Sequence, residues 1–139
     1  MALLLDTHIW IWYLENDEKR LSKKIVEHVR AAEARGEVLV SDISFWEVAN
    51  KSTRRKFFSI DAILWLQRAA TAPGLRYIPV ERATLVQSTE LSGTAPRDPA
   101  DRILIATAQL NGASLVTADK QILDYARHER GISVRDARS

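Results

Sequence analysis

The stretch Leu3-Leu4-Leu5-Asp6-Thr7 decides how the rest of this 139-residue chain is interpreted. Three consecutive aliphatic residues are typical of a short strand that is buried on both faces, as strands of a parallel sheet are. The strand pattern ends at Asp6, and a helical pattern begins after it. Ligands of open α/β sheets bind beyond the carboxyl ends of the strands. We therefore expect Asp6 to face a site, although an acid in that place is also a common turn or helix-capping residue.

The composition excludes several classes of protein and site. With 46% hydrophobic and 27% charged residues, the chain is an ordinary globular sequence, and its length suits a single domain over residues 1–139. It has no cysteine, which excludes disulfides and thiolate sites, and with three histidines a bound metal is expected to be held mainly by oxygen. No apolar run approaches the roughly 18 residues needed to cross a membrane, and no signal peptide is recognisable. The sequence therefore predicts a cytoplasmic protein without a membrane partner.

Strand and helix patterns alternate along the whole chain. After the first strand, further strands are expected at 37–41, 75–80 and 114–117, with a possible fifth at 132–134. Helices are expected at 7–14, from Leu21 to about Gly36, from about 42 to the basic cluster at 54–56, and at 60–71, 81–91, 98–110 and 121–128. The helix from Leu21 shows one apolar stripe, formed by Leu21, Ile25, Val29 and Ala32. This alternation predicts an α/β fold with a parallel sheet between helices.

The segment Asp98-Pro99-Ala100-Asp101 predicts the start of a helix. Asp98 suits the N-cap, a proline follows at the first helical position, and Asp101 falls at N3. Arg97 and Arg102 bracket the two acids. Cations beside carboxylates suit an anionic substrate, but solvated surface charges would give the same pattern.

Acidic residues recur at one edge of the predicted sheet. They are Asp6 and Asp119, which follow buried strands, Glu47 in the helix after the second strand, and Asp98 and Asp101 at the start of the helix before the fourth. Two carboxylates about 4 Å apart repel by roughly 4 kcal/mol at an effective dielectric constant near 20, so such a cluster needs a counter-charge. Oxygen ligands suit Mg²⁺ or Mn²⁺, which activate water and stabilise charge on a phosphoryl group. The pattern favours metal-dependent phosphodiester hydrolysis.

Each acid also has a purely structural interpretation. Asp98 and Asp119 are suitable helix caps, and Asp101 suits the positive end of a helix dipole. Glu47 precedes Lys51 by four residues, which is the spacing of a surface ion pair. His8 and His128 have no recognisable partner spacing. The four tryptophans, Trp10, Trp12, Trp46 and Trp65, are expected in the core or an interface rather than as platforms for base stacking.

Several segments together resemble a known family. They are 4–8 (LLDTH), 41–47 (SDISFWE), 98–102 (DPADR) with 105–108 (IATA), and 115–119 (LVTAD). In this order the segments resemble the PIN-domain ribonucleases of the VapC toxin type. The resemblance implies a Rossmann-like α/β/α sandwich with a parallel sheet of about five strands. It also implies an endoribonuclease that depends on Mg²⁺ or Mn²⁺ and inhibits translation, a homodimer, and neutralisation by a cognate antitoxin.

The resemblance also implies roles for individual residues. The acidic quartet of the family falls on Asp6, Glu47, Asp101 and Asp119, which become the expected catalytic residues and metal ligands. Asp98 is an additional acid of the subgroup with a DPxDR segment and a further expected ligand. Thr117 is the small hydroxyl residue before the last acid, and Thr7 and Arg102 are expected to support the site.

The sequence leaves two other functions open. A haloacid-dehalogenase-like phosphatase also begins with an aspartate after the first strand, but needs a second aspartate where this chain has His8. A module that binds RNA or a protein partner without catalysis is the other alternative, and the intact set of acids argues against it. We expect one apolar surface to form a homodimer interface or a groove for the antitoxin. It comprises Phe57-Phe58, the 60–71 helix and the helix bearing Trp10 and Trp12.

Overall fold

A computed structural model describes residues 1–52 and 61–139 of the chain. Within them the strands are β1 (Leu3–Leu5), β2 (Val38–Ser41), β3 (Arg76–Ile78), β4 (Ser114–Thr117) and β5 (Ser133–Asp136). The helices are α1 (Thr7–Leu14), α2 (Lys23–Ala34), α3 (Ile43–Ser52), α4 (Ala62–Ala70), α5 (Arg82–Thr89), α6 (Pro99–Leu110) and α7 (Lys120–His128). The basic cluster at 54–56 and Phe57-Phe58 lie outside the described residues.

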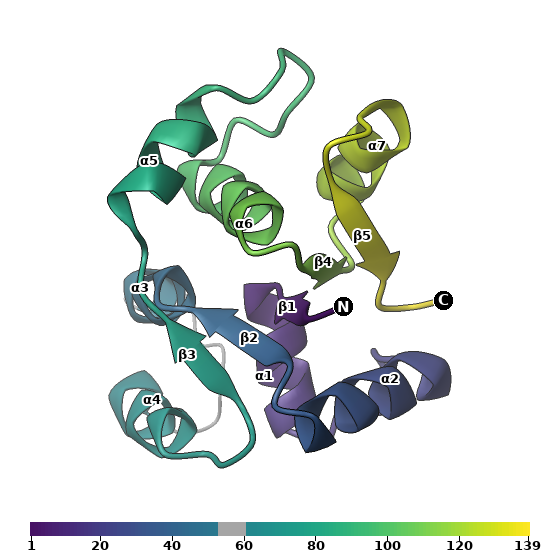
Figure 1. The fold of residues 1–139 in the computed structure, drawn as a ribbon. Coiled ribbons are helices and arrows are strands. Elements are labelled where there is room, and N and C mark those ends of the chain that lie inside the picture. Colours follow the sequence, from purple (N-terminus) through teal and green to yellow (C-terminus); the bar gives the residue numbers. More distant parts are fainter. Residues whose placement is uncertain (53–60) are drawn as a thin grey trace.

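The strands form one parallel sheet between two layers of helices. Helices α1, α2 and α4 lie on one side of the sheet, and α5, α6 and α7 lie on the other (Figure 1). Strand β1 is central, and its side chains alternate between the two layers. Leu3 and Leu5 pack with Ile9 and Trp10 on one side, whereas Leu4 packs into the cluster on the other side. Burial on both faces explains the run of three leucines, and the predicted α/β/α architecture is confirmed.

The strand order places a crevice beside Asp6. The order is β3-β2-β1-β4-β5, so the chain moves outward in one direction from β1 to β3 and then returns to the other side of β1 with β4. The connections after β1 and β4 therefore lead to opposite sides of the sheet, which opens a crevice at their carboxyl ends. Asp6 follows β1, and its backbone N–H donates to the Val116 carbonyl of β4 at 3.0 Å. The residue that ends the first strand thus lies at the topological switch point.

Several element boundaries differ from the sequence expectation by one or a few residues, and two of the differences have a clear physical cause. Helix α2 begins at Lys23 rather than Leu21, because the Ser22 hydroxyl accepts the Ile25 N–H at 3.1 Å as the N-cap. Leu21 is still buried. Its position in the apolar stripe therefore indicates correctly that the residue is buried, but not that it is helical. The third strand is only three residues long and stops before Pro79, which has no N–H for the ladder.

The tryptophans divide between core and surface. Trp10 is fully buried, and its ring centroid lies 5.0 Å from that of Phe45 and 4.9 Å from that of Trp65. Trp10 and Trp65 are core residues, as expected. Trp46 is 56% exposed and Trp12 is partly buried, so both are accessible at the surface.

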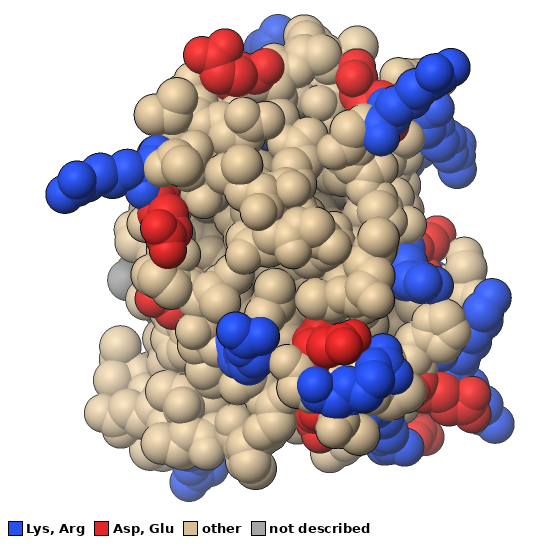
Figure 2. All heavy atoms as spheres, in the orientation of Figure 1, with Lys and Arg blue, Asp and Glu red and all other residues tan. Residues whose placement is uncertain are grey.

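Charge is distributed rather than concentrated on the face shown in Figures 1 and 2. Lys and Arg side chains lie mainly around the rim of that face, next to Asp and Glu, and most of its centre is uncharged (Figure 2). The net charge of +2 is therefore no guide to where an anionic ligand binds on this face. The helices in the described ranges include none that is long and apolar enough to cross a membrane.

Candidate active site

Asp6 is a buried carboxylate at the junction of β1 and α1. As the N-cap of α1, it accepts the Thr7 N–H on Oδ1 at 2.7 Å, and it accepts the Thr117 hydroxyl on Oδ2 at 2.6 Å. Burial is the main cause that raises the pKa of Asp6 to about 6, and repulsion from Glu47 and Asp119 adds to it. The hydrogen bond from Thr117 and that from the Thr7 backbone act in the opposite direction. Asp6 is therefore held in place in a setting that resists its ionisation.

Thr117 connects Asp6 to the acid that follows β4. Its buried hydroxyl donates to Asp6 and accepts the Asp119 N–H at 3.0 Å. Asp119 caps α7, because its Oδ1 accepts the N–H groups of Gln121 at 2.8 Å and Ile122 at 3.1 Å. The capping interpretation of Asp119 is confirmed. Oδ1 accepts both capping hydrogen bonds, so capping does not exclude a second role for the other oxygen of this carboxylate.

Glu47 reaches the same edge of the sheet from α3. It is only 3% exposed, which rules out a surface location, and its Oε1 accepts the Thr7 hydroxyl at 2.6 Å. The Thr7 hydroxyl also lies 2.8 Å from that of Ser44, one helical turn before Glu47. Ser44 is a supporting residue that the sequence argument missed, although its i,i+3 spacing from Glu47 is visible in the SDISFWE segment.

The two acids at the start of α6 have different environments. Asp98 is exposed and is the N-cap of α6, with Oδ1 accepting the Ala100 N–H at 3.1 Å, as predicted. Asp101 is at N3 and partly buried. Burial is the largest cause that raises the pKa of Asp101 to about 8, followed by repulsion from Asp6, Asp98, Asp119 and Glu47. The fold therefore brings all five predicted acids within electrostatic range of one another, with Asp101 affected by the other four.

These residues fit a divalent cation in donor chemistry and charge. Carboxylate oxygens are ligands that hard cations prefer, and the raised pKa values of Asp6 and Asp101 show that positive charge is favoured there. In the described part of the chain, no three acidic or histidine side chains converge closely enough to hold a metal as they lie. Mutual repulsion opposes such convergence when the charges are uncompensated.

Arg102 lies differently from the substrate-facing cation that the sequence suggested. Its Nε donates to the Ser88 carbonyl at 2.9 Å, and its Nη1 donates to the Pro96 carbonyl at 3.0 Å. Ser88 belongs to α5 and Pro96 to the loop before α6, so the guanidinium holds that loop in place. Arg102 thus supports the site through the backbone that positions Asp98 and Asp101.

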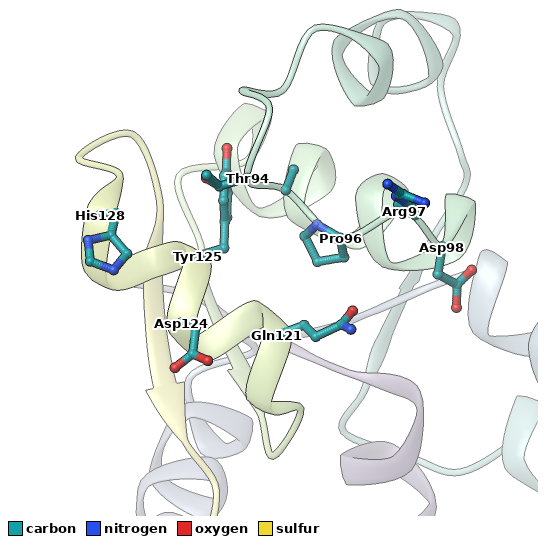
Figure 3. Close-up of a pocket in the computed structure, with 9 residues that line it drawn as sticks. Thr94, Pro96, Arg97, Asp98, Gln121, Asp124, Tyr125 and His128 are labelled. Atoms are coloured by element: carbon teal, nitrogen blue, oxygen red, sulfur yellow. The ribbon is translucent and has the colours of Figure 1, made fainter.

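A cavity of about 430 Å³ adjoins the acids between the loop before α6 and helix α7. Gln121 extends from α7 toward the Pro96–Asp98 segment, and the Tyr125 ring lies beside Thr94 (Figure 3). Gln121 is also the residue whose N–H is capped by Asp119, and Asp98 itself lines the cavity. The cavity therefore extends the site on the α7 side. No local sequence pattern indicates this cavity, because two segments distant in sequence form it.

Comparisons with known proteins agree with this geometry. The model of the PIN-domain family matches residues 3–128. Ribonuclease VapC22 of Mycobacterium tuberculosis (strain ATCC 25618 / H37Rv) is 30% identical over 134 residues, covering 96% of this chain and 98% of that protein.

Solved structures with the same fold include two toxin–antitoxin complexes. They are DNA-bound VapBC from Salmonella typhimurium, with a TM-score of 0.69 and 16% identity, and a toxin–antitoxin complex from Klebsiella pneumoniae, with a TM-score of 0.63 and 21% identity. Each match covers 98% of both chains. At these low identities the solved structures show only that the fold is alike. The assignment of the chain to a family depends on the family match over residues 3–128 and on the VapC22 relative. The chain therefore belongs to the PIN-domain family, among the VapC ribonucleases.

Proposed function

We propose that this protein is an endoribonuclease that hydrolyses RNA phosphodiester bonds at Asp6, Glu47, Asp101 and Asp119 with the help of Mg²⁺ or Mn²⁺. The observation that carries the proposal is the gathering of five carboxylates at one edge of the sheet, where Thr117 contacts both Asp6 and Asp119 and where burial and the four neighbouring acids raise the pKa of Asp101 to about 8. Such an arrangement costs stability in the protein alone, and strongly perturbed groups of this kind concentrate at functional sites. The VapC22 relative, which is named a ribonuclease, supports the choice of RNA as substrate.

The side chains of the site have distinct tasks in this proposal. Asp6, Glu47, Asp101 and Asp119 would hold the ion, with Asp98 at the exposed edge. A bound divalent cation supplies activation of water and neutralisation of phosphoryl charge.

The chain's own hydroxyl groups hold the acids in position. Thr117 fixes the rotamer of Asp6 and lowers its pKa, which favours the ionised form. Thr7 holds the Glu47 carboxylate in position by donating its hydroxyl to Oε1. Asp101 is the carboxyl that holds a proton near neutral pH until positive charge at the site lowers its pKa.

Membership of the PIN-domain family removes the haloacid-dehalogenase-like phosphatase from consideration. The exposed His8 stands where that class needs a second aspartate. The non-catalytic binding module is the alternative that an experiment must separate, because it predicts the same fold and the same family match.

The proposal is tested by single-turnover cleavage of an end-labelled structured RNA. We expect the wild type to cut in Mg²⁺ or Mn²⁺ and to stop in EDTA, and Asp6→Asn to be inactive in every condition. Circular dichroism of Asp6→Asn provides the control for folding, since asparagine is nearly isosteric with aspartate. Equal cleavage with and without a divalent cation, or near wild-type cleavage by folded Asp6→Asn, would contradict the proposal.

We also propose a cognate antitoxin and a homodimer for this chain, with inhibition of translation as the consequence of RNA cleavage. The toxin–antitoxin complex among the similar folds supports the antitoxin. Helix α4 supports an interface, because Ile63 is 57% and Leu64 is 41% exposed. Apolar side chains in adjacent exposed positions favour a helix or a second copy packed against them. Ile63→Glu should weaken dimerisation in light scattering or binding of the antitoxin, and a monomer whose antitoxin affinity this substitution leaves unchanged would argue against the interface.

A further inference from the structure

A second cavity, of about 410 Å³, lies between α1, the loop before α2 and the residues after β5. It is lined by Trp12, Lys19, Arg20, Leu21, Ser22 and Arg138. We call it the Trp12 pocket. Its volume lies in the range of sites that bind small molecules or single residues of a polymer. Three of these six lining residues are cationic and one is an indole, whereas the described lining contains no carboxylate.

Hydrogen bonds connect this pocket to the elements that carry the acids. Arg138 donates from Nη2 to the Ala118 carbonyl at 3.0 Å, and Ala118 directly precedes Asp119. The Ser22 N–H donates to the Ala137 carbonyl at 3.0 Å, which ties the loop before α2 to the residues after β5. Trp12 lies six residues after Asp6 on α1, a distance of about 9 Å along the helix axis. A single strand of nucleic acid is long enough to contact both places.

The aromatic and cationic groups of the pocket are in contact. The Arg20 guanidinium carbon lies 5.6 Å from the centroid of the Trp12 ring, and the His8 ring centroid lies 5.8 Å from that of Trp12. Arg20 also pairs with Asp17 at 2.5 Å, yet its side chain remains 62% exposed. Arg20 is thus held over the indole while its charge stays accessible. Trp12 differs in this respect from Trp10 and Trp65, which are core residues.

We propose that the Trp12 pocket binds a nucleotide of single-stranded RNA that flanks the bond to be cut. Lys19, Arg20 and Arg138 contact its phosphates, and the Trp12 ring stacks against its base. This inference rests on the proposed ribonuclease function and extends it to how the substrate is held.

Electrostatics favours a site of this kind. Without a bound cation the ionised acids of the site repel an RNA phosphate, so cations elsewhere on the surface would add affinity for the substrate. Proteins that bind single strands without strong sequence preference combine a cationic groove with aromatic stacking platforms. An acidic peptide would satisfy the cations but would leave the indole without a stacking partner. A nucleotide uses both features, which is why we assign the pocket to RNA.

The test is RNA binding measured without cleavage. Fluorescence anisotropy of a labelled single-stranded RNA oligonucleotide is recorded in EDTA at several salt concentrations for the wild type, Lys19→Gln, Arg138→Gln and Trp12→Leu. Lys24→Gln is the matched control, because Lys24 is an exposed cation of α2 outside the pocket lining. Circular dichroism checks the fold of each variant. If Trp12→Leu is destabilised, the RNA affinities of Lys19→Gln and Arg138→Gln test the proposal without it.

The charge and aromatic variants should differ in their dependence on salt. Lys19→Gln and Arg138→Gln should weaken binding roughly three- to tenfold and reduce the slope of log affinity against log salt by about 0.7 each. Trp12→Leu should weaken binding roughly tenfold with an unchanged slope, because stacking releases no counterions. Lys24→Gln should change neither quantity.

The failures of the two proposals are distinguishable. If the wild type binds and cuts RNA while the pocket variants bind it as tightly as Lys24→Gln does, the pocket assignment is wrong and the ribonuclease proposal stands. If the variants keep RNA affinity but lose binding to poly-glutamate, the pocket serves a protein carboxylate instead. A wild type that neither binds nor cuts RNA overturns both proposals.

Discussion

Replacing Thr117 by valine removes a buried hydroxyl while nearly preserving the shape of the side chain. That hydroxyl donates to Asp6 Oδ2 at 2.6 Å and accepts the Asp119 N–H at 3.0 Å. A hydrogen bond to a charged group contributes about 1.5–3 kcal/mol and a neutral one about 1 kcal/mol. Because Thr117 and Asp6 are buried, water does not readily replace either partner. We expect Thr117→Val to lower the free energy of unfolding by about 3 kcal/mol when Asp6 is ionised.

The cost should depend on pH through Asp6. The folded pKa of about 6 lies above the ordinary 3.8, so the folded protein binds more protons than the unfolded chain between these values. Its stability therefore falls as pH rises from about 4 to about 6. The Thr117 hydrogen bond lowers this pKa, so its removal moves the folded pKa further up and extends the decline to higher pH. Thr117→Val should cost less at pH 5, where Asp6 is protonated, than at pH 8.

Urea unfolding in EDTA at pH 5 and pH 8 measures both effects. Thr107→Val is the matched control, because Thr107 is also buried but donates to the Ile103 carbonyl within its own helix. Thr117→Ser, which keeps the hydroxyl, should recover most of the pH-dependent part of the loss. A Thr117→Val cost that is no larger than that of Thr107→Val and equal at both pH values would refute this role of the hydroxyl.

Other substitutions separate charge, capping and packing. The stability of metal-free Asp101→Asn relative to the wild type should be greater at pH 9 than at pH 5, by on the order of 1 kcal/mol. The reason is that the raised folded pKa of Asp101, about 8, makes the stability of the wild type fall as pH rises through that range, whereas asparagine does not titrate. Urea unfolding of both proteins at the two pH values measures this, and an equal pH dependence would contradict it. Asp98→Ser should change stability by a few tenths of a kcal/mol and Asp98→Ala should cost about 1 kcal/mol, since only serine keeps a capping oxygen; equal losses in chemical unfolding would show that the cap contributes little. Trp10→Ala should cost about 3–5 kcal/mol in thermal or urea unfolding, because the ring is fully buried among aromatic neighbours.

The order of elements could be predicted because each element carries its own local signal. Leu3–Leu5 is buried on both faces and therefore uniformly aliphatic, and the Asp98–Asp101 segment combines a cap, a proline and an acid in the first turn. The start of α2 was misplaced because Leu21 is buried by tertiary packing, whereas the N-cap Ser22 makes Lys23 the first residue of the helix. Strand order was not predicted, because the pairing of β1 with β4 joins segments that are about 110 residues apart.

The acids could be predicted as a group, but their partners could not. Parallel strands share one carboxyl edge, which is sufficient to bring Asp6 and Asp119 together from the sequence pattern alone. The contact of Thr7 with Glu47 and the backbone anchoring of Arg102 depend on how α3 and α5 pack, which no local pattern specifies. The Trp12 pocket is the extreme case, because α1, the loop before α2 and the C-terminal residues form it together.

The ribonuclease site is tested most directly by the single-turnover rate at which wild type and Asp101→Asn cleave the same labelled RNA. Both proteins are measured at one Mg²⁺ concentration that saturates the wild type. Asp101 is the carboxyl affected by all four other acids, and its replacement retains the size of the side chain but removes its charge. We expect the rate to fall by more than the roughly 100-fold that loss of an outer-shell partner can cost. A folded Asp101→Asn protein that cuts RNA at close to the wild-type rate would contradict the assignment of the site to these carboxylates.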